Sequence, residues 1–154
     1  MKPGKVRAIA ICIFSHNSHI LVAEGYDEVK KQLFYRPLGG TIEFSEYGHQ
    51  TIHREIREEL NLGVKNIRYL GTLENVFTYN GKLGHEIVLV FDGEFEAEFP
   101  YTQKALHGME DTLEPIKAVW MSPDEFGNLI ASKHINNRPP LYPTGLLELL
   151  KENL

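Results

Sequence analysis

The sequence is poor in cysteine and in long apolar runs, and each shortage excludes a class of protein. Cys12 is the only cysteine in 154 residues, so no disulfide can form within the chain. Because it lies in the apolar run AIAICIF, we expect a small buried side chain there. No apolar run approaches the roughly 20 residues that span a bilayer, so the sequence predicts a cytoplasmic protein without a membrane partner.

Positive charge is also scarce, and together with the length this indicates one small globular domain. Lysine and arginine number 16 against 21 aspartates and glutamates, which gives a net charge of −5. This balance argues against binding to a nucleic-acid polymer by charge alone. The composition, 42% hydrophobic and 24% charged, is ordinary for a globular protein. A chain of this length suits one hydrophobic core, so we predict a single domain over residues 1–154.

Apolar and β-branched runs predict most of a sheet. Strands are expected at residues 5–14, 19–25, 64–79, 84–96 and 116–121. We expect the first two to pair as a hairpin across a polar turn, and Asn80-Gly81-Lys82 to turn a second hairpin. The acid-rich stretch 97–115 is predicted to be a long loop.

Two helices are expected near the C-terminal end. Ser122-Pro123-Asp124-Glu125 has the pattern of a capping box and should start a short helix that runs to about Ile130. Residues 142–154 should form a closing amphipathic helix, whose leucines would suit a homodimer.

The stretch from Gly39 to Leu62 predicts a glycine loop followed by a helix. Ser45 is the expected N-cap, and Asn61 should end the helix in a left-handed conformation. An apolar stripe recurs every fourth residue and should face the core: Ile52, Ile56 and Leu60.

Three glutamates crowd one face of this helix. Glu55, Glu58 and Glu59 stand at positions i, i+3 and i+4, so their like charges are neighbours. Each such pair costs roughly 0.2–0.5 kcal/mol in an isolated helix, so something must compensate. Carboxylate oxygens are ligands for hard divalent cations such as Mg²⁺ or Mn²⁺. The alternative is a solvated face on which Arg54 pairs with Glu58 at i, i+4.

With its flanking residues, this helix resembles the signature of the Nudix hydrolases. The family spacing is G-x5-E-x7-R-E-U-x-E-E-x-G-U, where U is aliphatic, and it covers 23 residues here. The matching positions are Gly40, Glu46, Arg54, Glu55, Ile56, Glu58, Glu59 and Leu62, whereas Asn61 replaces the late glycine. The resemblance implies an α+β fold, an α/β/α sandwich around a mixed β-sheet. It also implies a Mg²⁺- or Mn²⁺-dependent hydrolase that cleaves a nucleoside diphosphate linked to another moiety X.

The resemblance further assigns roles to individual residues. The implied metal ligands are the backbone carbonyl of Gly39 with Glu55, Glu58 and Glu59. Arg54 would orient a glutamate, and Gly40 and Glu46 would support the site. The general base is either a helix glutamate or a loop acid, for which Glu114 is favoured over Glu110 and Asp111.

Residues before the glycines would help to form the mouth for a small nucleotide substrate. Phe34 or Tyr35 could stack on a base and Arg36 could meet a phosphate, although aromatic residues beside a strand are more often core. His85 begins a strand that should face the cleft, where it would contact substrate or serve as a structural histidine.

Three other interpretations stay open. His49 and His53 have the i, i+4 spacing of a zinc pair, but the glutamate of the HExxH motif is missing. A nucleotide-binding or sensing module could keep the fold without turnover. In such a module, some of the three helix glutamates should be replaced by other residues, but here all three are present. A dinucleoside-polyphosphate or cap hydrolase would differ in where the phosphate chain is cut.

Overall fold

The structure is a computed structural model that describes residues 4–109, 114–122, 124–125 and 146. Its strands are β1 (Val6–Ile13), β2 (Ser15–His16), β3 (His19–Asp27), β4 (Gln32–Thr41), β5 (Val64–Tyr79), β6 (Lys82–Phe95), β7 (Ala105–Met109) and β8 (Pro115–Met121). Helix α1 spans Gly48–Leu60, and a 3-10 helix spans Phe99–Tyr101. In this part of the chain no helix is long and apolar enough to cross a membrane.

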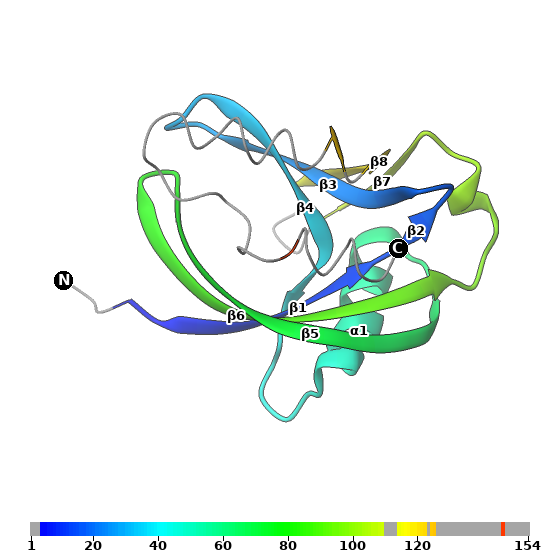
Figure 1. The fold of residues 1–154 in the computed structure, drawn as a ribbon, viewed down its shortest axis with the longest axis horizontal. Helices are drawn as coiled ribbons and strands as arrows, with labels where there is room; N and C mark the ends of the chain where they lie inside the picture. The colour runs from blue at the N-terminus through cyan, green and yellow to red at the C-terminus, as the bar shows by residue number, and fades with distance from the viewer. Residues whose placement is uncertain (1–3, 110–113, 123, 126–145, 147–154) are drawn as a thin grey trace.

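The strands form one mixed sheet, in agreement with the predicted fold class. Its order is β5-β6-β1-β4-β3-β8-β7, with β2 paired to β3. β1 and β6 run parallel and the other pairs are antiparallel. Helix α1 packs against one face of this strongly curved sheet (Figure 1).

Each face of the sheet has its own apolar core. On the α1 side, Ile52 and Ile56 are fully buried against Cys12 and its neighbours, as the apolar stripe predicts. Burial raises the pKa of the Cys12 thiol, and Asp92 adds to this rise, so the thiol stays neutral. The other core is built around residues of β1, β3 and β6, and Leu146 is buried in it.

The predicted pairing of residues 5–14 with 19–25 is wrong. β1 lies between β6 and β4, so both of its edges are occupied, and β3 pairs instead with β4 and β8. Only the two-residue β2 pairs back onto β3, across Asn17 and Ser18, both of which have positive φ. Strand partners are set by contacts far apart in sequence, which a local turn pattern does not reveal.

The stretch predicted as a long loop, residues 97–115, contains the 3-10 helix and β7. β7 pairs with β8 and lies beside the end of α1. A Cβ atom on Gly108 would lie 1.8 Å from the backbone oxygen of Glu59, so glycine is what permits this close approach. The prediction of a long loop was therefore wrong for residues 99–101 and 105–109.

The start of α1 also differs from the prediction. Ser45 has φ 68° and precedes the helix, whose N-cap is Tyr47. The side chain of Gln50 accepts a hydrogen bond of 2.8 Å from the Tyr47 amide. At the other end, Asn61 is left-handed with φ 55°, as expected.

Of the remaining predicted elements, the hairpin through Asn80-Gly81 and the strand at 116–121 are confirmed. The Glu125 amide donates to Ser122 Oγ at 3.1 Å, which agrees with a cap at that position. The rest of the helix expected to run to Ile130 lies outside the described residues. So does the helix expected at 142–154, apart from Leu146.

The tips of the β3–β4 and β5–β6 hairpins are joined by hydrogen bonds. Buried Asp27 accepts from the amides of Val29 and Lys30, both at 2.9 Å, and from the amide of Asn80 at 3.3 Å. Lys30 Nζ donates to Thr78 O at 2.8 Å, and Asn80 Oδ1 accepts from the Glu28 amide at 2.9 Å. We call these contacts the hairpin bridge.

The carboxylate of Asp27 is the centre of the hairpin bridge. Its burial by itself would raise its pKa, but the three backbone amides and the ammonium of Lys30 outweigh this, and the pKa is lowered from its ordinary 3.8. The carboxylate therefore stays charged in the folded protein, and its charge stabilises the bridge.

Asp27→Asn should destabilise the protein. The new amide group would face donors that now bind a carboxylate oxygen, so we expect the free energy of unfolding to fall by about 1–3 kcal/mol. Urea denaturation measures the change. Glu28→Gln is the matched control, since its side chain is exposed and only its backbone amide joins the bridge. Equal stability of the two variants would contradict the role given to Asp27.

Candidate functional site

A cavity of about 930 Å³ lies between the two hairpins and α1. Residues of β1, β3, β4, β5, β6 and α1 line it. This volume falls in the range of sites that bind small molecules, roughly 300–1,000 Å³. The cavity contains Glu55 and Glu59 of the helix, both glycines before it, and Glu114 beside β8.

The two glycines let β4 approach β1 and the helix closely. Gly39 has φ 155°, and a Cβ atom on it would lie 2.0 Å from the backbone oxygen of Ala10. A Cβ atom on Gly40 would lie 2.4 Å from the carboxyl carbon of Glu55. Glycine is therefore needed at both positions, and the second brings the Glu55 carboxylate directly onto the strand backbone.

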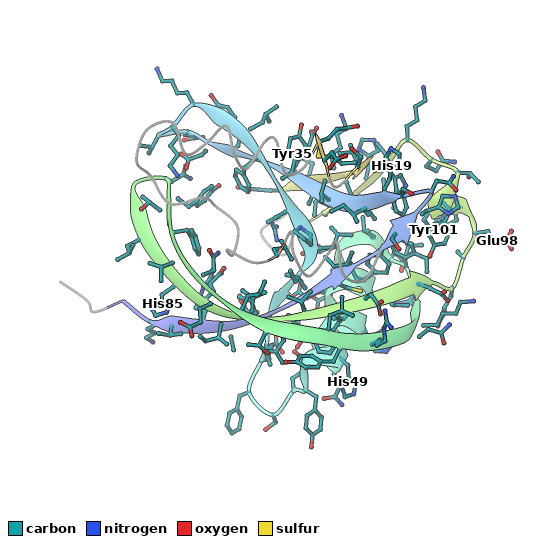
Figure 2. All side chains as sticks on the ribbon, in the orientation of Figure 1. His19, Tyr35, His49, His85, Glu98 and Tyr101 are labelled. Atoms are coloured by element: carbon teal, nitrogen blue, oxygen red, sulfur yellow. The ribbon has the colours of Figure 1, made fainter. Side chains whose placement is uncertain are left out.

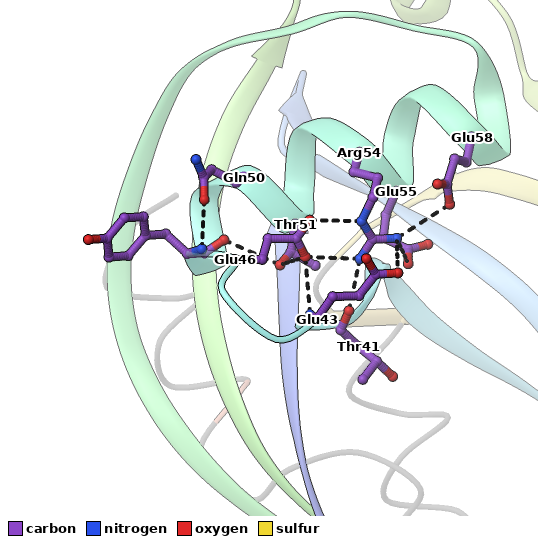
Figure 3. A network of polar contacts seen from close by, with 9 residues as sticks. Thr41, Glu43, Glu46, Gln50, Thr51, Arg54, Glu55 and Glu58 are labelled. Atoms are coloured by element: carbon purple, nitrogen blue, oxygen red, sulfur yellow. Dashed lines mark hydrogen bonds and ion pairs between the residues drawn. The ribbon is translucent and has the colours of Figure 1, made fainter.

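The guanidinium of Arg54 connects the acids of the predicted site (Figure 3). Its Nε and Nη2 donate to the two carboxylate oxygens of Glu46, at 2.8 and 3.0 Å. Its Nη1 lies 2.8 Å from Glu55 Oε1 and 3.4 Å from Glu58 Oε2. Nη2 also donates to Thr41 O at 3.0 Å. The pairing of Arg54 with Glu58, which was the alternative interpretation of this helix, is thus present as one part of a larger network.

The network shifts the ionisation of its members. The hydrogen bonds from Arg54, together with one of 2.6 Å from Thr51 Oγ1, lower the pKa of Glu46 to about 2. The same contacts with Glu46 and Glu55 raise the pKa of Arg54 above its ordinary range. The site therefore keeps a fixed positive charge among its carboxylates over the whole physiological range.

The three helix glutamates differ in exposure. Glu55 and Glu59 are 7% and 8% exposed, whereas the side chain of Glu58 is 41% exposed. Only Glu55 and Glu59 line the cavity. Within the described ranges, no group of three or more His, Cys, Asp or Glu side chains is arranged to hold a metal ion.

The donor set nevertheless fits a hard divalent cation. All of the predicted ligands are oxygen atoms, three of them on carboxylates of one helix face, and this is the ligand type that Mg²⁺ prefers. Arg54 holds two of these carboxylates, Glu55 and Glu58, through one nitrogen.

Two of the four substrate residues predicted from the sequence line the cavity. Phe34 and Arg36 line it, and the Phe34 ring also meets Tyr79 edge-on with centroids 5.4 Å apart. Tyr35 is not a lining residue, but its hydroxyl donates to the lining residue Glu24 at 3.2 Å. Burial, followed by the charge of Glu24, raises the pKa of Tyr35.

The histidines lie apart from these residues. His85 stands near the start of β6 and does not line the cavity, although its neighbour Glu86 does (Figure 2). His49 and His53 are exposed on α1, and the His49 ring stacks on Tyr47 at 5.7 Å. Neither belongs to a metal-holding group in the part of the chain that the structure describes.

Sequence reasoning missed several polar residues of the cavity, among them Arg7 and Asn75, and it named Glu86 only together with His85. Arg7 Nη2 lies 2.6 Å from Glu86 Oε2, and Asn75 is only 4% exposed. They come from three different strands, so only the register between β1, β5 and β6 brings them together. The one available signal was a polar residue inside each apolar strand.

Comparison with known proteins gives one family. The model described as the NUDIX domain matches residues 4–144. The NAD-capped RNA hydrolase NudC of Mannheimia succiniciproducens is 44% identical over 50 residues, which cover 32% of this chain and 19% of that protein. The match thus spans about a fifth of the length of that relative.

Solved structures agree with this match. A MutT NUDIX hydrolase from Burkholderia pseudomallei has a TM-score of 0.62 at 16% identity, covering 97% of this chain and 99% of its own. An ADP compounds hydrolase has a TM-score of 0.62 at 15% identity, and the match covers 97% of this chain and 73% of that one. At such identities the likeness shows the fold alone.

The network around Arg54 predicts a pH dependence of stability. Because the pKa of Glu46 falls from 4.5 to about 2 on folding, its contribution is complete above pH 4.5 and is lost as pH falls through about 2. Glu46→Gln should therefore lose less stability than the unaltered protein across that window, as measured by urea denaturation at a series of pH values.

The matched control for this pH series is Glu43→Gln. Glu43 also faces Arg54, at 3.5 Å, but its side chain is 66% exposed. The control should keep the pH dependence of the unaltered protein. Parallel curves for Glu46→Gln and the unaltered protein would exclude Glu46 as the group responsible.

Proposed function

Because this chain belongs to the Nudix hydrolase family, we propose that it hydrolyses the diphosphate linkage of a nucleoside diphosphate joined to another moiety, with Mg²⁺ or Mn²⁺ as cofactor. The observation that carries this proposal is the wall of the cavity formed by Glu55, Glu59, Gly39 and Gly40. It combines buried carboxylates with glycine backbone, both of which line a space large enough for a nucleotide.

The charges of the cavity support the need for a cation. Six acidic residues line it, Glu24, Glu28, Glu55, Glu59, Glu86 and Glu114, against three basic residues, Arg7, Arg36 and Lys117. A diphosphate brings further negative charge into this acidic space. When bound, a divalent cation would neutralise the phosphate oxygens and lower the pKa of an attacking water.

The residues of this chain would bind the cation, position its ligands and contact the phosphates. The carboxylates of Glu55, Glu58 and Glu59 and the carbonyl of Gly39 would hold the cation. Arg54 is a positioning residue, since its Nη1 contacts both Glu55 and Glu58. Arg36 would contact a phosphate from β4, the strand that also carries Gly39.

Glu114 is our choice for the general base that takes the proton of the attacking water. It lines the same cavity as Glu55 and Glu59 and is itself exposed, so it can meet water there. Glu110 and Asp111, the alternatives, lie outside the described residues.

One comparison favours a second candidate substrate class. The relative NudC acts on NAD-capped RNA, so a diphosphate at the end of a capped chain is a further candidate. A dinucleoside or capped substrate would yield two nucleotides, whereas a nucleoside diphosphate linked to a smaller moiety yields one. Chromatography of the products separates the two classes.

Turnover itself is tested by phosphate release, using a coupled phosphatase and a panel of about twenty diphosphates that includes ADP-ribose, NADH and nucleotide sugars. We expect activity on at least one compound with Mg²⁺ and none without a divalent cation. Metal-independent binding without turnover on any compound would instead favour a nucleotide-binding module.

Glu58→Gln should reduce kcat by a factor on the order of a hundred or more, because the amide keeps the size of the side chain but loses the charge that holds a cation. Glu43→Gln is the matched control, since it also contacts Arg54 but is not a predicted ligand. If both variants retain normal turnover with Mg²⁺, the assignment of Glu58 as a ligand is wrong.

Glu114→Gln should lower kcat by roughly 10²–10⁴ and should remove the acidic limb of its pH profile, as expected for loss of a general base. Glu98→Gln is the control, because Glu98 is exposed and does not line the cavity. An unchanged pH profile in Glu114→Gln would assign the base to another acid.

A further inference from the structure

A separate set of polar side chains lies across the β1–β6–β5 wall of the cavity. Arg7 of β1 and Asn75 of β5 are both register partners of Glu86 on β6, so the three residues form one row across adjacent strands. All three line the cavity. We call them the polar row.

The polar row is preorganised. Arg7 Nη2 donates to Glu86 Oε2 at 2.6 Å, and Asn75 Nδ2 donates to Glu86 Oε1 at 3.5 Å. The side chain of Glu86 is 13% exposed and Asn75 is 4% exposed. Since a carboxylate has about four lone-pair sites, Glu86 can keep both contacts and still accept hydrogen bonds from a ligand.

The surroundings of the polar row are apolar and aromatic. The next row along β1 and β6 is Ile9 with Val88, and both line the cavity. On β5 the next residue of the same face is Phe77, whose ring lies over its partner Gly84, where a Cβ atom would be 2.4 Å away. A few fixed polar groups beside flat apolar surface are typical of a site that orients a planar ligand.

The opposite arm of the cavity repeats this aromatic arrangement. Phe34 of β4 is the register partner of Gly25 on β3, and a Cβ atom on Gly25 would lie 2.2 Å from its ring. Each hairpin therefore carries a ring that is held over a glycine, and both rings line the cavity. The hairpin bridge joins the tips of the same two arms.

The polar row lies within reach of the proposed catalytic end. Arg7 is four residues along β1, and on the same face, from Ile11, which is the register partner of Gly39 and also lines the cavity. At ~3.3 Å per residue this is about 13 Å along the strand. A ribose and its phosphates can bridge such a span, with the diphosphate at the helix and the base at the polar row.

We propose that the polar row binds the hydrogen-bonding edge of a guanine-type base, which makes guanosine diphosphates linked to another moiety the preferred substrates. Guanine offers two adjacent N–H donors, which match the carboxylate of Glu86, and a neighbouring carbonyl, which matches the amide of Asn75 or the guanidinium of Arg7. Adenine presents an unprotonated ring nitrogen at the same place, which a carboxylate repels. This inference rests on the proposed function and specifies its substrate.

The test compares kcat/KM for guanosine, inosine and adenosine diphosphates that carry the same sugar. A correct two-donor contact is worth about ten- to a hundredfold in discrimination, so guanosine should exceed adenosine by that factor, with inosine between them because it lacks the second donor. Glu86→Gln should reduce the preference to about threefold or less. Glu28→Gln, an exposed carboxylate of the same cavity, should keep it.

The outcomes separate the two proposals. If guanosine and adenosine diphosphates are hydrolysed with equal kcat/KM, the guanine preference is refuted and the proposed hydrolase activity still stands. If no diphosphate is hydrolysed, the hydrolase fails, and calorimetric titration with GMP and AMP tests the polar row by itself. Tighter binding of GMP supports the row, and equal binding overturns it.

Loss of folding in Glu86→Gln would be detected by thermal denaturation. In that case Asn75→Ala serves as the second variant, because it removes the amide without adding volume at this buried position. It should weaken GMP binding more than AMP binding, and an equal effect on the two nucleotides would overturn the inference.

Discussion

The contact between one guanidinium and four carboxylates is the interaction on which the proposed active site depends. Crowded acids on a helix face repel one another, and Arg54 offsets this repulsion by contacting Glu46, Glu55 and Glu58 at once, with exposed Glu43 at 3.5 Å. The contact with Glu46 also ties the segment before α1 to the middle of the helix. The acids are thereby held close together, and the carboxylate of Glu59 lines the cavity beside them.

The second constraint is that other groups pack directly against the backbone at several points of the same site. Glycine is found at each of these points, because a Cβ atom would clash there. Gly39 and Gly40 bring β4 against β1 and against Glu55, and Gly108 brings β7 against the end of α1. On the far side of the cavity, Gly25 and Gly84 make room for the rings of Phe34 and Phe77. The cavity therefore has a catalytic end shaped by backbone contacts and an aromatic end shaped by side chains lying over backbone.

Two hairpins enclose this space, and the hairpin bridge joins their tips. Asp27 is a buried charge whose donors come from both hairpins, so it couples the arms more strongly than two exposed side chains would. The same arms carry Phe34, Phe77 and the polar row. A change at the bridge would thus act on the walls of the cavity although no bridge residue belongs to the catalytic end.

The sequence by itself determined the helix with its apolar stripe and acids, the left-handed end at Asn61 and the hairpin through Asn80-Gly81, because each depends on the spacing of residues that are close in the chain. It also identified the family, since the spacing of its acids and glycines is local. Only the tertiary structure decided that β1 pairs with β6 rather than β3, that β7 exists, and that Tyr47 is the N-cap of α1. The polar row and the hairpin bridge belong with these, because strand register and the meeting of two hairpin tips depend on contacts between residues about 50 to 80 positions apart.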